Sequence, residues 1–232
     1  MKKIITTCCF CFALAMIFVA PATASVVIYG GSLAEGVYFG TGNSNVGWSY
    51  LTAGSLELGL RPVNRYLGAA SEVGQNYFVP TGATAVPGKT GSEWGIDFSV
   101  DTDIDSLGTT LVGYNYNLTI FDTTNGHSVS FDPSSIPDNA HLGAVGFQNS
   151  EAMSFSFISV PLGYNMNASD IYRITLSATQ VVGGDVQSLS VFVNAQAPEP
   201  AGQALVGLFA LCAIFAFKKM RRVNTSTSTS VA

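Results

Sequence analysis

Between residues 25 and 196 the chain is dominated by short stretches in which apolar and polar residues alternate. The clearest runs over 94–101, where Trp, Ile, Phe and Val alternate with Gly, Asp and Ser. A period of two residues is typical of a β-strand with one buried face and one face in water. Related patterns predict further strands at 26–29, 48–60, 76–79, 115–121, 129–131, 142–147, 153–160, 171–181 and 189–193.

Turn signals and the absence of helical periodicity define the fold class. Asn125-Gly126 predicts a tight hairpin turn between two strands, and Arg61-Pro62 is expected to end or bend the strand before it. No stretch of 25–196 sustains a 3.6-residue apolar period. Eight to eleven short strands separated by polar turns predict an all-β body. We expect a single antiparallel β-sandwich, jelly-roll or immunoglobulin-like in outline.

The first 24 residues have the three parts of a secretory signal peptide. Lys2 and Lys3 precede the apolar run 4–20, and Ala22 and Ala24 form an Ala-x-Ala cleavage site. Cleavage after Ala24 is therefore expected, with an uncleaved membrane anchor as the alternative. The body would then enter the periplasm.

A second apolar segment lies near the other end of the chain. Residues 201–217 carry no charge, and at about 1.5 Å per helical residue they reach roughly 25 Å, enough to span a hydrocarbon core. A basic cluster follows, which the positive-inside bias places in the cytoplasm; it consists of Lys218, Lys219, Arg221 and Arg222. Residues 223–232, mostly Ser and Thr, have too little apolar surface to fold.

Pro198, Glu199 and Pro200 separate the body from this segment. The order Pro-Glu-Pro, short apolar helix and basic cluster, over 197–222, closely resembles the PEP-CTERM sorting signal of Gram-negative bacteria. The resemblance implies recognition in the inner membrane by an exosortase, a cysteine transpeptidase-like enzyme that removes the helix. It also implies an inner-membrane-anchored precursor and a mature body at the cell surface or outside the cell. A plain C-terminal membrane anchor is the alternative.

Cysteine and charge are unevenly distributed. All four cysteines lie in the two apolar terminal segments, so disulfides, thiolate zinc sites and cysteine nucleophiles are excluded from the body. Between 25 and 200, four basic residues stand against all 15 acidic residues, a net charge of about −11. This balance argues against nucleic acid or anionic lipid as a partner.

The chain offers few candidates for metal or catalytic chemistry. Asp101, Asp103 and Asp105 alternate after a predicted strand and could converge on Ca²⁺, although a solvated acidic turn is the alternative and the EF-hand pattern is absent. His127 and His141 are the only histidines, and no Gly-x-Ser-x-Gly accompanies them. We therefore expect no enzyme activity and no cofactor other than calcium.

Aromatic residues raise the question of sugar binding. Trp94 is assigned to the core by its periodicity, whereas Trp48 and Tyr50 at a loop-to-strand junction are candidates for stacking on a sugar. Two hypotheses follow. The favoured one is a non-enzymatic structural or adhesive protein of the cell surface or extracellular matrix. The alternative is a carbohydrate-binding module or weak glycosidase whose partner is an extracellular polysaccharide.

Overall fold

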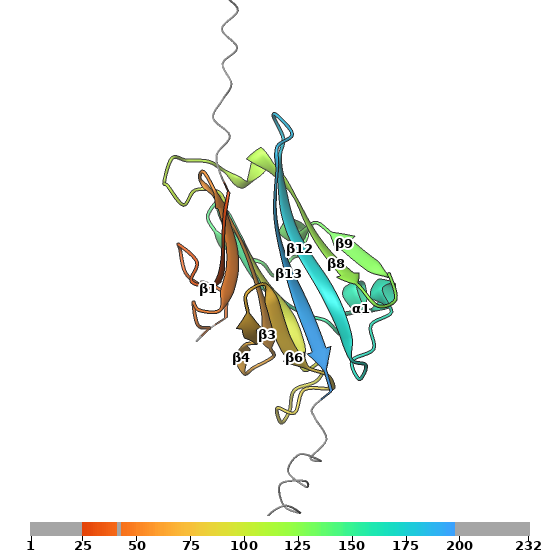
Figure 1. Ribbon diagram of the computed structural model, residues 1–232. Coiled ribbons are helices and arrows are strands. Elements are labelled where there is room, and N and C mark those ends of the chain that lie inside the picture. The colour runs from red at the N-terminus through yellow and green to blue at the C-terminus, as the bar shows by residue number, and fades with distance from the viewer. Residues whose placement is uncertain (1–24, 41–42, 198–232) are drawn as a thin grey trace, which may run out of the picture.

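The computed structural model describes residues 25–40 and 43–197, which are mostly β-structure in two sheets (Figure 1). The 7-stranded sheet A has the order β1 (Val26–Gly31), β2 (Trp48–Ala53), β3 (Leu56–Asn64), β7 (Trp94–Asp101), β11 (Gly146–Ala152) and β10 (Ala140–Leu142), with β4 (Gly68–Ala69) beside β3. The 6-stranded sheet B has the order β5 (Ser71–Val73), β6 (Asn76–Pro80), β13 (Val186–Gln196), β12 (Asp170–Gln180), β8 (Tyr114–Asp122) and β9 (Ser128–Phe131). Short 3-10 helices lie at Leu111–Gly113 and Pro133–Ser135.

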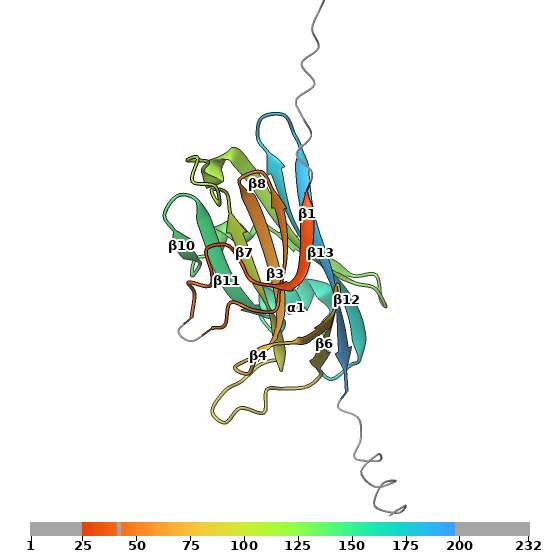
Figure 2. The ribbon, with the colours of Figure 1, turned by 60° about the vertical axis from the view of Figure 1, so that its left-hand side comes forward.

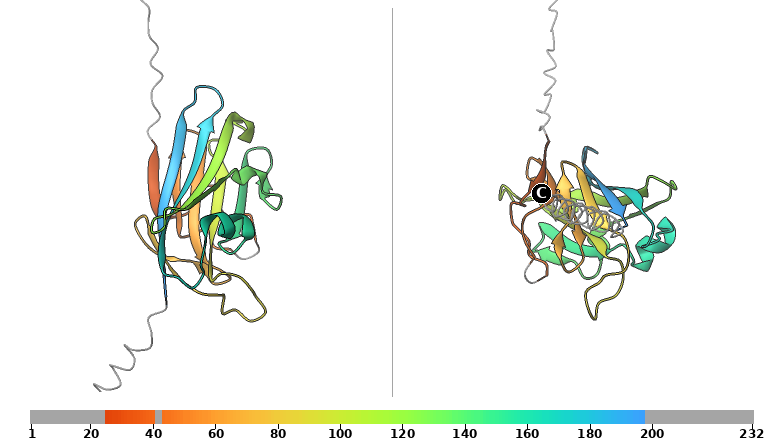
Figure 3. Two further views of the ribbon diagram at one scale, coloured as in Figure 1. Left: turned by 90° about the vertical axis from the view of Figure 1, so that its right-hand side faces the viewer. Right: turned by 60° about the horizontal axis from the view of Figure 1, so that its bottom comes forward.

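The two sheets pack face to face around one hydrophobic core (Figures 1 and 3). Each long strand contributes its alternate apolar residues, as the period of two requires. Trp94 is completely buried in this core, where its ring contacts Tyr172 and Tyr164. The assignment of Trp94 to the core is therefore confirmed.

Several predicted strands and one predicted turn are present. The strands β8, β12 and β13 follow the predicted alternation of buried and more exposed residues, and β7 is a strand as predicted, although all of its residues are buried. The Asn125-Gly126 turn joins β8 to β9, with Gly126 in the left-handed region at a φ of 78° and its N–H donating to the Asp122 carbonyl. The hairpin prediction is confirmed.

Three strand boundaries differ from the prediction. The predicted strand 48–60 is the hairpin β2–β3, which turns at Gly54 with a φ of 61°. The predicted strand 142–147 likewise covers the end of β10, the hairpin turn and the start of β11. The third strand continues through Arg61 and Pro62 to Asn64. There β3 stays paired with β7, with Pro62 opposite Ile96, and the Pro62 carbonyl accepts from the Ala70 N–H, although Pro lacks a donor of its own.

The predicted strand 153–160 is wrong, because this segment forms a turn and the helix α1 (Ser156–Leu162). The alternation of Ser and Phe suggested a strand, but Phe155 and Phe157 are both exposed. The residues that enter the core are Ile158 and Leu162, four positions apart, which is the spacing of one helical face. Gly163, in the left-handed conformation, ends the helix.

One strand pair departs from the expected antiparallel arrangement. The strands β6 and β13 run parallel in sheet B, with Tyr77 opposite Val193. After β6 the chain crosses to sheet A and forms β7, so β6 has no hairpin partner on that side. Over the described part of the chain, no helix has both the length and the apolarity needed to cross a membrane; the predicted span 201–217 lies outside those residues.

Candidate functional site

The outer face of sheet A is polar but buried, whereas the sequence predicted that it faces water. All eight residues of β7 are buried, including Asp97, Ser99 and Asp101. The cover is the segment between β1 and β2, residues 32–40 and 43–47, called the strap below. In Figure 2 the strap is the orange loop that crosses the strands β3, β7 and β11.

Three neighbouring strands contribute the polar side chains under the strap. Across β3 and β7, Glu57 lies opposite Asp101 and Arg61 lies opposite Asp97. Gln148 of β11 lies opposite Ser99 of β7. Directly opposed residues point to the same face of a sheet, so the register alone brings these side chains together.

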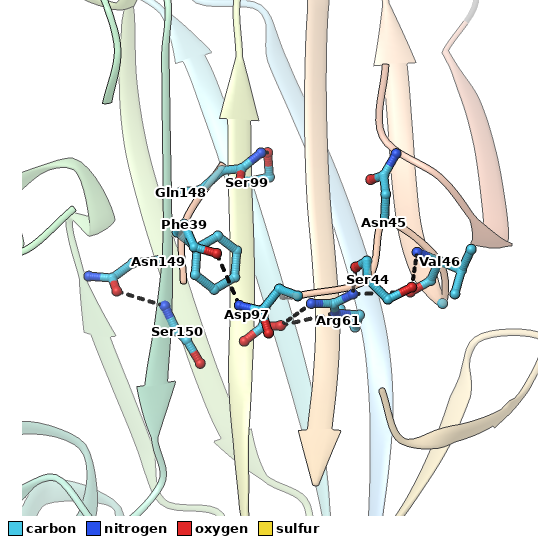
Figure 4. A network of polar contacts seen from close by, with 12 residues as sticks. Phe39, Ser44, Asn45, Val46, Arg61, Asp97, Ser99, Gln148, Asn149 and Ser150 are labelled. Carbon is cyan, nitrogen blue, oxygen red and sulfur yellow. Dashed lines mark hydrogen bonds and ion pairs between the residues drawn. The ribbon is translucent and has the colours of Figure 1, made fainter. Parts of the chain in front are cut away.

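Arg61 makes the first attachment of the strap (Figure 4). Its Nε and Nη2 donate to Asp97 Oδ2 at 3.0 and 2.6 Å, and its Nη1 donates to the carbonyls of Ser44 and Val46 in the strap. Both side chains of the ion pair are at most 3% exposed. The Arg61 guanidinium also lies 4.5 Å from the centre of the Trp48 ring. Burial raises the pKa of the Asp97 carboxyl, and the Arg61 guanidinium opposes that rise.

Gln148 and Glu57 make the second and third attachments. Gln148 accepts from the Tyr38 N–H at 3.0 Å and donates to the Gly36 carbonyl at 2.8 Å. Its side-chain amide thus pairs with the strap backbone as the backbone of a neighbouring strand would. Both carboxylate oxygens of Glu57 accept from the Ala34 N–H, at 3.1 and 3.2 Å. Each attachment joins a side chain of the sheet to the backbone of the strap, so it depends little on the side chains of the strap.

Apolar contacts complete the attachment. Leu33, Phe39 and Trp48 form a small second core under the strap. A Cβ added at Gly59 would lie 2.7 Å from Leu33, so Gly59 provides the space that Leu33 fills. Trp48 is completely buried here, which rules it out as an exposed sugar platform, while Tyr50 is half-buried.

The acidic groups under the strap lie in a poorly solvated environment. Burial raises the pKa of Glu57 to about 7, helped by the nearby charge of Asp101 and opposed by the hydrogen bond from Ala34. Burial also raises the pKa of Asp101, whose Oδ2 has no hydrogen-bond partner among the residues that the structure describes. On the opposite face of β11, burial and the charge of Asp138 raise the pKa of Glu151 to about 7. These carboxyls favour the protonated form more than exposed ones do.

The candidate calcium ligands bond mainly to the backbone of their own loop. Asp101 Oδ1 accepts from the Asp103 N–H, Asp103 Oδ1 from Gly108 and Thr109, and Asp105 Oδ1 from Leu107. Among residues 25–40 and 43–197, no group of three or more acidic or histidine side chains is placed to hold a metal ion. The histidines are also apart, with His127 next to β9 of sheet B and His141 in β10 of sheet A.

A cleft of about 660 Å³ opens where the strap meets the end of β3. Its lining is about half polar and half apolar and consists of Phe39, Gly40, Asn43, Ser44, Arg61, Val63, Asn64, Arg65, Tyr66, Leu67, Gly68, Ala69, Asp97 and Ser150. At its rim, the Arg65 guanidinium and the Lys89 ammonium each lie 4.9 Å from the centre of the Tyr66 ring. The sequence did not predict this cleft, because its lining comes from four separate parts of the chain that meet only in the folded protein.

The residues of the predicted sorting signals lie outside the described part of the chain. They are Ala22, Ala24, Pro198, Glu199, Pro200, Lys218, Lys219, Arg221 and Arg222. The chain matches no protein-family model, and no curated protein sequence is significantly similar to it.

Proposed function

We propose that this chain is a non-enzymatic, exported protein of the cell surface or extracellular matrix, processed at its C-terminal PEP-CTERM signal by an exosortase. In this proposal its body is a β-sandwich, jelly-roll or immunoglobulin-like in outline, that acts as a structural or adhesive unit. The N-terminal signal peptide delivers the body to the periplasm. The C-terminal signal holds the precursor in the inner membrane until processing.

One observation supports the proposal most directly. The first strand, β1, begins at one end of the body, and the last strand, β13, ends at the opposite end (Figures 1 and 3). A body attached at the end of β13 would therefore present the opposite end, with the β12–β13 turn and the loop after β7, away from its attachment point. Such an arrangement suits a unit that contacts material outside the cell.

The sorting signal can be tested in the native host with Pro198→Ala combined with Pro200→Ala. We expect the full-length form to accumulate in the inner membrane, because the proposed recognition sequence is lost. Pro161→Ala, which changes an exposed proline of α1, is the matched control and should be processed normally. Cell fractionation and mass spectrometry of the C-terminus are the measurements. Release of an unchanged mature form from the double variant would contradict processing by an exosortase.

A specific observation favours carbohydrate binding as a second candidate function. The cleft beside the strap has both polar and apolar lining residues and an aromatic residue at its rim, a combination that suits the hydroxyl groups and the apolar ring face of a sugar. Asp97 is the one acidic residue in its described lining, and it is paired with Arg61. Because glycoside hydrolysis generally needs two carboxyl groups flanking the bond, this lining favours binding over a glycosidase. Glycan-array binding of the purified chain, with and without chelator, tests this candidate and the calcium alternative together.

A further inference from the structure

Two of the four basic residues of the body, Arg65 and Lys89, lie together near one aromatic ring rather than beside acidic residues. Acidic residues far outnumber basic ones, so each cation could readily have an acidic partner. Nevertheless, Arg61–Asp97 is the one ion pair within residues 25–40 and 43–197. Arg65 and Lys89 have no carboxylate within 4 Å there, although they come from different loops and both lie beside Tyr66.

Both positive charges lie near the ring of Tyr66. Arg65 Nη1 donates to the Thr90 carbonyl at 3.1 Å, and its Nη2 donates to Tyr66 Oη at 2.9 Å. The first bond joins the β3–β4 turn to the loop that carries Lys89. Two cations near one ring repel each other, and a cation–π contact at an exposed site is weak. An anion bound close to both cations would relieve that repulsion.

Tyr66 itself has an unfavourable backbone conformation. Its φ is 67°, in the left-handed region, which is unfavourable for a non-glycine residue. Its side chain is 51% exposed, so burial of the ring does not explain why Tyr rather than Gly stands here. Strain of this kind is often found where a side chain serves a ligand.

The cleft beside this cluster can bind hydroxyl groups. Asn43, Ser44 and Ser150 line it with exposed side chains that can donate and accept hydrogen bonds. The charged side chains of the lining are Arg61, Arg65 and Asp97, so the local charge is positive within an acidic body. At physiological ionic strength the Debye length is about 8 Å, which limits repulsion from distant acidic residues.

An exposed aromatic surface continues from the cluster. The Arg65 guanidinium lies 6.0 Å from the Phe155 ring, and Phe155 stacks with Phe157 at 6.3 Å between ring centres. Both phenylalanine side chains are more than 40% exposed. Such rings can pack against the apolar face of a sugar ring.

From these features we infer that the cleft and its rim bind a carboxylate-bearing sugar, such as a uronic acid unit of an extracellular polysaccharide. Arg65 and Lys89 hold the carboxylate, and the Asn and Ser side chains of the cleft bind the hydroxyls. This inference rests on the second candidate function and adds the chemical class of its ligand. It is independent of processing at the C-terminal signal.

The test is isothermal titration calorimetry of the full-length chain in mild detergent with trigalacturonate. Its neutral methyl ester and glutarate, a carboxylate without a sugar, are the comparison ligands. We expect trigalacturonate to bind at least about tenfold more tightly than either one, because a charge-assisted hydrogen bond is worth about 1.5–3 kcal/mol and 1.4 kcal/mol is tenfold. Arg65→Gln and Lys89→Gln should each weaken binding of trigalacturonate by about tenfold.

Arg173→Gln is the matched control. Arg173 also lies over an aromatic ring, at 5.2 Å from the centre of Phe121, but on the outer face of sheet B. The change should leave binding unaltered. Tyr66→Gly should weaken binding while leaving the thermal unfolding temperature unchanged or higher, because Gly adopts the left-handed conformation without strain. This variant separates loss of the site from loss of the fold.

Different results of the titration would overturn different parts of this inference. Equal binding of the acid and its methyl ester would overturn the carboxylate site but leave carbohydrate binding intact. Binding of glutarate as tight as trigalacturonate would overturn the sugar part. No binding of any sugar would overturn both this inference and the second candidate function. An equal effect of Arg173→Gln would show that net charge, rather than the cleft, determines binding.

Discussion

The two outer faces of this protein have similar sequence patterns and opposite environments. In sheet B, the outward residues of β12 and β13, such as Arg173, Thr175 and Ser190, are exposed or half-buried, and Thr175 and Ser190 hydrogen-bond to each other. In sheet A, the corresponding outward residues Arg61 and Asp97 are buried under the strap. Polar residues at alternate positions therefore establish which face is not core, but not whether that face is covered.

Charge distinguishes the two faces. The outward residues under the strap include opposite charges in register, whereas those of β8, β12 and β13 are mostly neutral hydroxyl and amide side chains. A buried charge without a partner is costly, so a covered polar face needs its charges paired or its carboxyls protonated. Sheet A has an ion pair at Arg61–Asp97 and a carboxyl with a raised pKa at Glu57.

The largest effect is expected from Arg61→Met. It leaves the Asp97 carboxylate and the carbonyls of Ser44 and Val46 without a donor in a buried site, which should lower the free energy of unfolding by about 3–5 kcal/mol. Arg173→Met on sheet B removes an exposed cation–π contact and should cost less than about 1 kcal/mol. Urea unfolding followed by tryptophan fluorescence measures both. Equal losses would contradict the difference between the faces.

The second effect is a dependence of stability on pH. The pKa of Glu57 rises from 4.5 to about 7 on folding, so between these values the folded state binds more protons than the unfolded state. Stability therefore falls as pH rises through this range, by on the order of 2 kcal/mol for this carboxyl. Glu151, whose pKa is also about 7, acts in the same direction.

Glu57→Gln isolates the contribution of Glu57, because glutamine keeps one oxygen for the Ala34 N–H and cannot ionise. The urea midpoint of this variant should vary less between pH 5 and pH 8 than that of the parent chain. Asp185→Asn in the exposed β12–β13 turn removes one charge without changing a buried group, and should leave the profile unaltered. A Glu57→Gln profile identical to that of the parent chain would show that Glu57 is not buried.

A third effect tests the packing of Leu33 on sheet A. In Gly59→Ala the added Cβ would lie 2.7 Å from Leu33 and 3.2 Å from Ser99, so overpacking should cost about 1–3 kcal/mol. Gly113→Ala, at a position with open space around it, should be neutral or stabilising by up to about 1 kcal/mol. Thermal unfolding of both variants gives the comparison. Full tolerance of Gly59→Ala would mean that the strap does not pack here.

The smallest effect is expected from Gln148→Ala. It removes hydrogen bonds to Tyr38, Gly36 and Ser99 but leaves no unpaired charge, so the loss should be about 1–2 kcal/mol. Ser190→Ala, which removes the 2.8 Å contact with Thr175 on the half-exposed face of sheet B, should cost no more than about 0.5 kcal/mol. Urea unfolding of both variants at a single pH gives the two free energies of unfolding to compare. Reversal of this order would contradict the structural role of Gln148.

The strands of the core could be predicted from the sequence because their signal is local. The alternation in β7, β8 and β12 gives strand, buried face and approximate length. The same signal failed at Phe155 and Phe157, where the apolar residues of an alternating pattern remain exposed and the helical pair Ile158 and Leu162 enters the core. Two adjacent strands without an obvious turn, such as β2 and β3, were also merged into one.

The candidate site could not be predicted because its contacts are distant along the chain. The abundance of Gly, Asn and Ser before β2 indicated a loop, but nothing in it indicated docking on sheet A. The pairing of Arg61 with Asp97 crosses 36 residues, and only the register of β3 and β7 shows it. Arg65 and Lys89 belong to separate loops and meet only around Tyr66.

Hydrogen exchange of the strap tests the central difference between the two faces most directly. The Ala34 and Tyr38 amides donate to Glu57 and Gln148, so in the native full-length chain we expect both to exchange at least about 100-fold more slowly than in an unstructured peptide. Arg61→Met should accelerate both while leaving amides of β12 protected. Exchange of Ala34 and Tyr38 at the rate of a free peptide in the parent chain would show that the polar face of sheet A is open to water.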